Sequence, residues 1–237
     1  MGKMHTDREY EAELTALRER VLLMAARVEE QVNGALRAYQ TQDSVLAERV
    51  RHADSQVDQL EVEIDGLCVQ MLARRQPVAS DLRFVTTILK IVTDLERIGD
   101  LATSICKRVT ELQRTPGAYR PSALQEMGEA ARNMVRDAVD ALVAGDASKA
   151  REVSRRDQLI DEQHAAFFPI IARQMEATPS DFDHLMSMIS ISKAIERIAD
   201  HATNLAEMVV FMVEGRDVRH VHEDKPERKQ RAEKPGH

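Results

Sequence analysis

Four pairs of acidic residues stand four positions apart in this sequence. They are Asp54 with Asp58, Glu96 with Asp100, Asp157 with Asp161, and Glu196 with Asp200. On a helix, residues i and i+4 are neighbours, and two carboxylates placed there repel each other by a few tenths of a kcal/mol. A bound cation would reverse that interaction, and Mg, Mn, Fe and Zn all accept oxygen ligands in such an arrangement. We therefore predict that the eight acids are metal ligands. The alternative interpretation is an exposed acidic face whose carboxylates are hydrated or paired with arginine.

The acidic pairs belong to an internal repeat. Residues 80–109, shifted by 100 positions, fall on 180–209, and ten of the 30 positions are identical. Upstream, a shift of 103 positions aligns further matches, such as Asp43 with Asp146. The difference of three positions falls in a loop, where a change of length costs little. Each half should therefore be one unit of three helices with short connections, which favours antiparallel neighbours.

Apolar residues recur with helical spacing along most of the chain. This pattern predicts six helices, at about 7–42, 44–75, 79–113, 121–144, 147–177 and 180–214. The predicted fold class is all-α, with three-helix bundles at 1–113 and 121–214 and a disordered charged tail at 222–237. Ser80 and Ser180 each follow shortly after a proline and are predicted to cap helix starts.

The acids of the third helix should face away from the bundle core. An apolar stripe centred on Leu95 marks the inward face, and at about 100° per residue Glu96 and Asp100 lie roughly 140–180° from it. The equivalent acids of the sixth helix occupy the same face. Any metal is therefore expected on the bundle surface. Adjacent residues diverge on a helix, so we expect neither Arg97 nor Arg197 to bridge its own glutamate well.

Composition excludes several classes of function. The net charge of −7 argues against general nucleic-acid binding and against an anionic membrane surface. The two cysteines form no CxxC pair, which argues against a zinc finger and fits a reducing compartment. The first residues lack the apolar region of a signal peptide, and no uncharged apolar run approaches about 18 residues. We therefore expect a cytoplasmic protein.

Several stretches resemble the PhoU family of phosphate-uptake regulators. They are RRQPVASDLR at 74–83, DLERIGD at 94–100, AIERIADHATN at 194–204 and GRDVRH at 215–220. The likeness extends from about residue 5 to residue 221. The motifs occur twice, in order, at the family's spacing. Ala199 departs from the glycine found at position 99.

The resemblance implies a cytoplasmic, non-enzymatic protein of two similar three-helix bundles, often a homodimer. Family members carry E/D-x-x-x-D motifs, which the four acidic pairs match, and some hold metal clusters on the bundle surfaces. The resemblance also implies a negative regulator that restrains phosphate uptake and signals phosphate sufficiency. Its expected partners are the ATPase subunit of the phosphate ABC transporter and a sensor histidine kinase, so that it meets the membrane only through partners.

A carboxylate-bridged metalloenzyme in a helical bundle is the alternative function. Such di-iron sites use Glu-x-x-His motifs on inward faces. Here Glu96 is followed three positions later by Gly99, and Glu196 by Ala199. The acids are also expected to face outward, so the regulator is the favoured interpretation.

Overall fold

The computed structural model describes residues 2–75, 77, 79–114, 119–216 and 218, and this part of the chain is helical with no strand. The helices are α1 (Gly2–Thr41), α2 (Ser44–Arg75), α3 (Ala79–Leu112), α4 (Ser122–Ala144), α5 (Ala147–Ala177) and α6 (Phe182–Glu214). A short 3-10 helix, Pro179–Asp181, precedes α6. The predicted all-α class and the six helices are confirmed. The tail at 222–237 and residues 115–118, between the two predicted bundles, lie outside the described residues.

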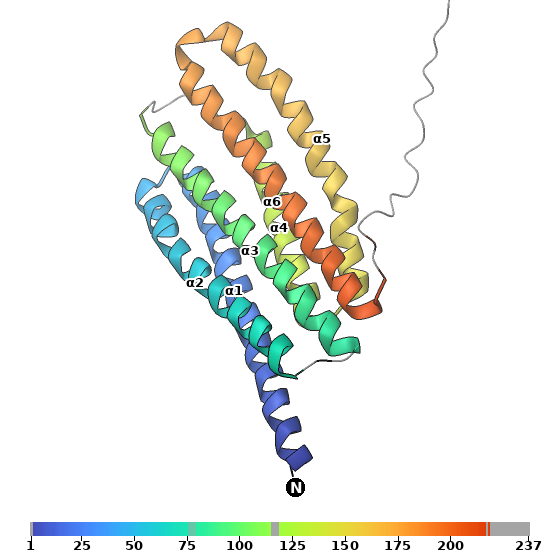
Figure 1. Ribbon diagram of the computed structural model, residues 1–237. Helices are drawn as coiled ribbons and strands as arrows, with labels where there is room; N and C mark the ends of the chain where they lie inside the picture. Colours follow the sequence, from blue (N-terminus) through green and yellow to red (C-terminus); the bar gives the residue numbers. More distant parts are fainter. Residues whose placement is uncertain (1, 76, 78, 115–118, 217, 219–237) are drawn as a thin grey trace, which may run out of the picture.

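The six helices form two groups of three. Within each group every helix contacts the other two: α1, α2 and α3 in one, and α4, α5 and α6 in the other. Consecutive helices run in alternating directions, and α3 and α6 lie side by side where the groups meet (Figure 1). α1 also contacts α4. The two bundles therefore share a broad interface, while the exact bounds of 1–113 and 121–214 stay a prediction.

Most of the side chains that fill the interior are aliphatic. Leu95 and Ile98 of α3 are fully buried, and their counterparts Ile195 and Ile198 of α6 are 1% exposed. The apolar stripe of each third helix thus faces the core, which fixes the rotation of α3 and α6 about their axes.

Aspartates cap α2 and α5, the helices that carry half of the acidic pairs, and the serine caps predicted for α3 and α6 do not form. The Asp43 carboxylate accepts a hydrogen bond from the Leu46 amide at the start of α2, at 2.9 Å. The equivalent Asp146 caps α5 by accepting from the amides of Ser148 and Lys149. The predicted caps are wrong: Ser80 lies inside the first turn of α3, and Ser180 lies in the 3-10 helix before α6.

A cluster of three polar side chains joins the bundles across the contact of α3 with α6. Asp94 of α3 lies 2.8 Å from His201 Nδ1 and accepts a 3.3 Å hydrogen bond from the Asn204 amide, both on α6. Side chains of Asp94 and His201 are only 14% and 18% exposed, so the link is largely shielded from water.

No helix among the described residues is both long enough and apolar enough to cross a membrane.

Truncating either matched core isoleucine should destabilise the protein strongly. Ile98→Ala and Ile198→Ala each remove a buried side chain at the centre of a bundle, and we expect a loss of about 2–4 kcal/mol in the free energy of unfolding. Urea unfolding followed by circular dichroism measures this. Lys107→Ala, at an exposed position of α3, is the control and should change stability by less than about 0.5 kcal/mol. A loss below about 1 kcal/mol at either isoleucine would contradict the described packing.

Candidate metal centre

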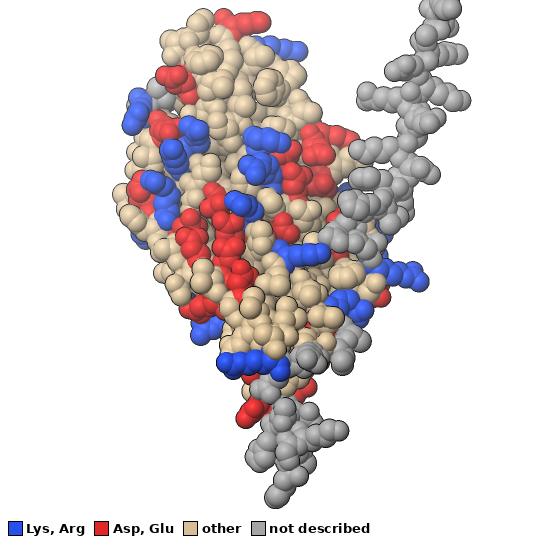
Figure 2. Space-filling view, in the orientation of Figure 1, with Lys and Arg blue, Asp and Glu red and all other residues tan. Residues whose placement is uncertain are grey.

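The structure gathers the predicted acids into two clusters, one in each bundle. The first cluster consists of Asp54, Asp58, Glu96 and Asp100, from α2 and α3, with Glu61 of α2 beside them. The second cluster consists of Asp157, Asp161, Glu196 and Asp200, from α5 and α6. Figure 2 shows acidic side chains gathered in two patches on one face, one over α2 and α3 and the other over α5 and α6.

Helix starts and core packing together set the register of both clusters. Asp54 follows its capping residue Asp43 by eleven positions, and Asp157 follows Asp146 by the same interval. The buried stripes of α3 and α6 then turn the third-helix acids toward the second helix of the same bundle. The repeat in sequence thus places acids along the line of contact between two helices in each bundle, and we call this line of contact a groove.

In the first cluster, burial and neighbouring negative charges together raise the pKa values of three carboxyl groups. Burial, and after it the neighbouring Asp100, raises the pKa of Glu96 to about 7. Burial also raises the pKa of Asp54, and the charges of Asp58 and Asp100 raise it further. Glu61 has a raised pKa for the same reasons, with Asp58 and Asp100 among its neighbours. The carboxylates of α2 and α3 therefore act on one another electrostatically.

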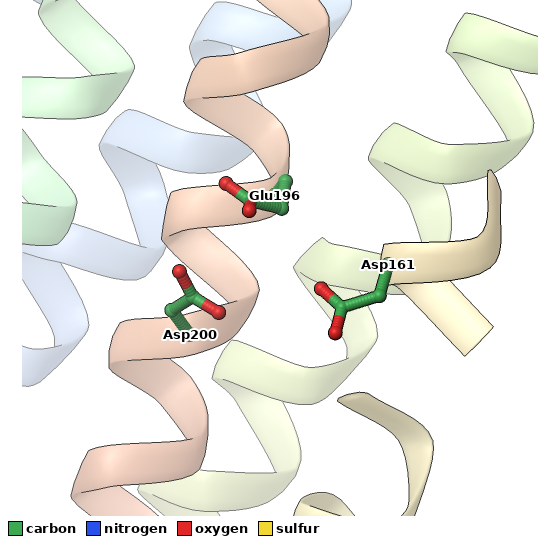
Figure 3. Close-up of side chains that lie close together, drawn as sticks. All are labelled: Asp161, Glu196 and Asp200. Carbon is green, nitrogen blue, oxygen red and sulfur yellow. The ribbon is translucent and has the colours of Figure 1, made fainter. Parts of the chain in front are cut away.

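In the second cluster the ligand atoms converge. Three carboxylate oxygens, one each from Asp161, Glu196 and Asp200, lie within 4.8 Å of one another. Figure 3 shows Asp161 of α5 pointing toward α6, where Glu196 and Asp200 lie one turn apart. Burial, followed by the charge of Asp200, raises the pKa of Asp157 to about 6. Burial likewise raises the pKa of Asp200, with Glu196 adding to it.

The acids are more enclosed than the helical geometry alone predicts. The side chains of Glu96 and Glu196 are 18% and 13% exposed, whereas Asp100 is 46% exposed. The predicted angle between these acids and the apolar stripe would leave them exposed on an isolated helix. In the bundle, the neighbouring second helix covers part of the face that carries them. The clusters therefore lie partly buried between two helices and not on an open outer face.

Basic residues contact both clusters, and one of these contacts corrects a prediction. Arg97 Nε lies 3.4 Å from its own neighbour Glu96, and Arg97 Nη1 lies 3.5 Å from Asp100. Its flexible side chain bends back over the groove despite the divergence of adjacent positions. In the second cluster Lys193 Nζ lies 2.6 Å from Glu196, a contact that sequence reasoning missed although the two are three positions apart. Both basic side chains are 53% exposed, so a cation could displace them at little cost.

The donor set fits a hard or borderline cation. Carboxylate oxygens in a shallow groove can bind Mg, Mn, Fe or Zn ions, with water completing the coordination shell. One buried oxygen of Asp157, Oδ1, has no hydrogen-bond partner among the described residues. A cation would supply the missing favourable interaction to this oxygen and its charged neighbours.

The fold and site together define a class: a duplicated three-helix-bundle protein with an acidic groove in each repeat. A family model, the PhoU domain, matches the chain twice, at residues 21–109 and 124–209. Together the two matches cover most of the chain and coincide with the two bundles. The chain belongs to the PhoU family.

Relatives and solved structures of the same family cover nearly the whole chain. It is 42% identical over 220 residues to a phosphate-specific transport system accessory protein PhoU homolog of Pseudomonas putida, covering 92% of this chain and 85% of that relative. It is 35% identical over 222 residues to the phosphate-specific transport system accessory protein PhoU of Escherichia coli, covering 93% of this chain and 91% of that relative. The crystal structure of PhoU from Pseudomonas aeruginosa superposes with a TM-score of 0.85 at 38% identity, covering 87% of this chain and 100% of that one. The crystal structure of the phosphate transport system regulatory protein PhoU from Streptococcus pneumoniae superposes with a TM-score of 0.78 at 29% identity. The match covers 88% of this chain and 99% of that one.

Neutralising one acid in each cluster should stabilise the metal-free protein at high pH. Carboxyls with a raised pKa stabilise the fold fully below their ordinary values of 4.5 for Glu96 and 3.8 for Asp157. That contribution is lost as the pH rises through about 7 and about 6, respectively. Glu96→Gln/Asp157→Asn should therefore gain roughly 1–2 kcal/mol over wild type at pH 8, and less at pH 5. Urea unfolding with a chelator present measures both differences, and an equal effect at the two pH values would contradict the assignment.

Proposed function

We propose that the chain is a non-catalytic regulator of phosphate uptake that binds divalent or iron-type cations at its two acidic clusters. The relatives named above are accessory or regulatory proteins of phosphate transport, which supports a role in the same system. The proposed partners are the ATPase subunit of the phosphate ABC transporter and a sensor histidine kinase, both met in the cytoplasm. A homodimer is the proposed assembly.

The observation that carries the cation-binding part is the convergence of one carboxylate oxygen each from Asp161, Glu196 and Asp200. Among the described residues only the second cluster brings three such oxygens within 4.8 Å of one another, and the first cluster is included because the repeat places the matching acids there. In each bundle acids of two helices lie near enough to raise one another's pKa, although like charges at such spacing weaken the fold. A cation that binds only the folded groove would remove this repulsion and hold two helices of a bundle together. Cation binding would then stiffen each bundle and so alter the surface that a protein partner meets.

The alternative of a carboxylate-bridged metalloenzyme has less support. Di-iron bundles draw their ligands from inward-facing residues, including a histidine three positions after a glutamate. In this chain Gly99 and Ala199 occupy those positions, and the centre of each bundle is aliphatic. The clusters lie in peripheral grooves between two helices, which suits a structural or sensing ion.

Cations should raise the thermal midpoint of the wild type more than that of Asp100→Asn/Asp200→Asn. At a free cation concentration of 100 times its Kd the expected gain is about 2.7 kcal/mol, or roughly 5–10 °C for a chain of this length. Differential scanning fluorimetry with Mg²⁺, Mn²⁺, Zn²⁺ and Fe²⁺ measures the shift. Glu126→Gln/Glu176→Gln neutralises two exposed acids outside the clusters and should respond like wild type. Equal shifts in all three proteins, or none in any, would reject the cation-binding role.

The partner assignment is tested separately. Affinity-tagged chain should co-purify with the ATPase subunit of the phosphate transporter and with the sensor kinase when all are co-expressed. The same pull-down with Asp100→Asn/Asp200→Asn, which carries damaged clusters, shows whether cation binding affects the association. Failure of wild-type protein to retain either partner, in the presence and absence of Mn²⁺, would reject the proposed partners and leave the cation result intact.

A further inference from the structure

A buried glutamine from the first helix reaches into the first acidic cluster. Gln31 of α1 is only 3% exposed, and its Nε2 donates a 3.0 Å hydrogen bond to Oδ1 of Asp54. Its own oxygen, Oε1, is buried and has no hydrogen-bond partner among the described residues. A buried amide with one unsatisfied oxygen is costly in a bundle core, so its contact with Asp54 calls for a physical reason.

Gly99 makes room for this glutamine. A Cβ atom added to Gly99 would lie 2.8 Å from Gln31 Oε1 and 3.5 Å from Asp54 Oδ1. The first of these distances is too short for a carbon–oxygen contact, and Gln31, at 3% exposed, is surrounded by other atoms. Alanine at position 99 would therefore push the Gln31 side chain out of its place.

The second bundle replaces both members of this pair. Under the shifts of the repeat, Gln31 corresponds to Met134 of α4, and Gly99 to Ala199 of α6. Both replacements are apolar, and both are buried. Asp157, the counterpart of Asp54, accordingly has no amide donor from the first helix of its bundle, and its Oδ1 is left without a partner among the described residues. Thr203 of α6 is near enough to favour its charged form, but burial and like charges outweigh this.

We infer that Gln31 is a positioning residue that holds the Asp54 carboxylate for cation binding, so that the two clusters are inequivalent cation sites. A carboxylate oxygen has more than one lone pair, so Asp54 can accept the amide hydrogen bond and still bind a cation. Fixing the carboxylate beforehand lowers the entropy lost on binding. Loss of a hydrogen bond behind a ligand typically weakens metal binding by 10- to 100-fold. The inference rests on the proposed function, because it requires that the clusters bind cations.

The experiment isolates each cluster and then removes the glutamine. Asp157→Asn/Asp200→Asn leaves only the first cluster active, and Asp54→Asn/Asp100→Asn leaves only the second. Gln31→Met, which introduces the residue of the other bundle, is added to each background. Titration with Mn²⁺, followed by electron paramagnetic resonance, gives the apparent Kd. We expect Gln31→Met to raise the Kd of the first cluster by about tenfold or more and to leave that of the second cluster within twofold.

Gly99→Ala provides an independent variant, because it displaces Gln31 without removing it. It should weaken Mn²⁺ binding at the first cluster about as much as Gln31→Met does. The double variant Gln31→Met/Gly99→Ala should bind Mn²⁺ no more weakly than either single variant, because both substitutions act through one hydrogen bond. A Kd unchanged by both substitutions, or raised equally in both clusters, would overturn the positioning role. If the two starting backgrounds themselves bind no Mn²⁺, the cation-binding part of the proposed function fails, and this inference fails with it.

Discussion

Half-buried carboxylates that face one another across two helices are the constraint on which this structure depends. Packing brings them together: each aliphatic side chain buried beneath the grooves contributes about 1.5–3 kcal/mol, against a few tenths of a kcal/mol lost for each neighbouring pair of acids. The core therefore prevails, and the unfavourable charge persists in the grooves. It can be relieved by a proton, by Arg97 or Lys193, or by a cation. The raised pKa values of Glu96 and Asp157 reflect this conflict between packing and charge.

The helices and the paired acids could be predicted from the sequence because both depend on local spacing. The apolar period locates α3 and α6, and the i, i+4 acids follow from the same period. The partial burial of Glu96 and Glu196 could not be predicted, because a helical wheel contains no information about the neighbouring helix that covers one flank. The helix caps could not be predicted for a related reason. A serine after a proline is a local signal, but Ser80 lies inside the first turn of α3 and Ser180 lies in the 3-10 helix before α6. The caps by Asp43 and Asp146 form on α2 and α5, for which no cap was predicted.

The role of Gln31 was hidden for another reason. Its partner Asp54 lies 23 positions away on a different helix, and no spacing rule connects them. A signal was nevertheless present in the repeat, since Gln31 with Gly99 in one half stands against Met134 with Ala199 in the other. Paired departures from an internal repeat are informative because a duplicated unit supplies its own reference. The comparison identifies positions where polarity and size changed together.

The link between Asp94 and His201 has a consequence for how the duplicated halves recognise each other. The repeat pairs Asp94 with Ala194, and His201 with Leu101, so the shared interface is not its own mirror image. If two copies of the first bundle met in the same way, Asp94 would face Leu101 in place of His201 and would lose that partner. Two copies of the second bundle would set His201 against an alanine. Burying an unpaired polar group is unfavourable. Because the two halves have diverged at these positions, each bundle pairs better with the other bundle than with a second copy of itself.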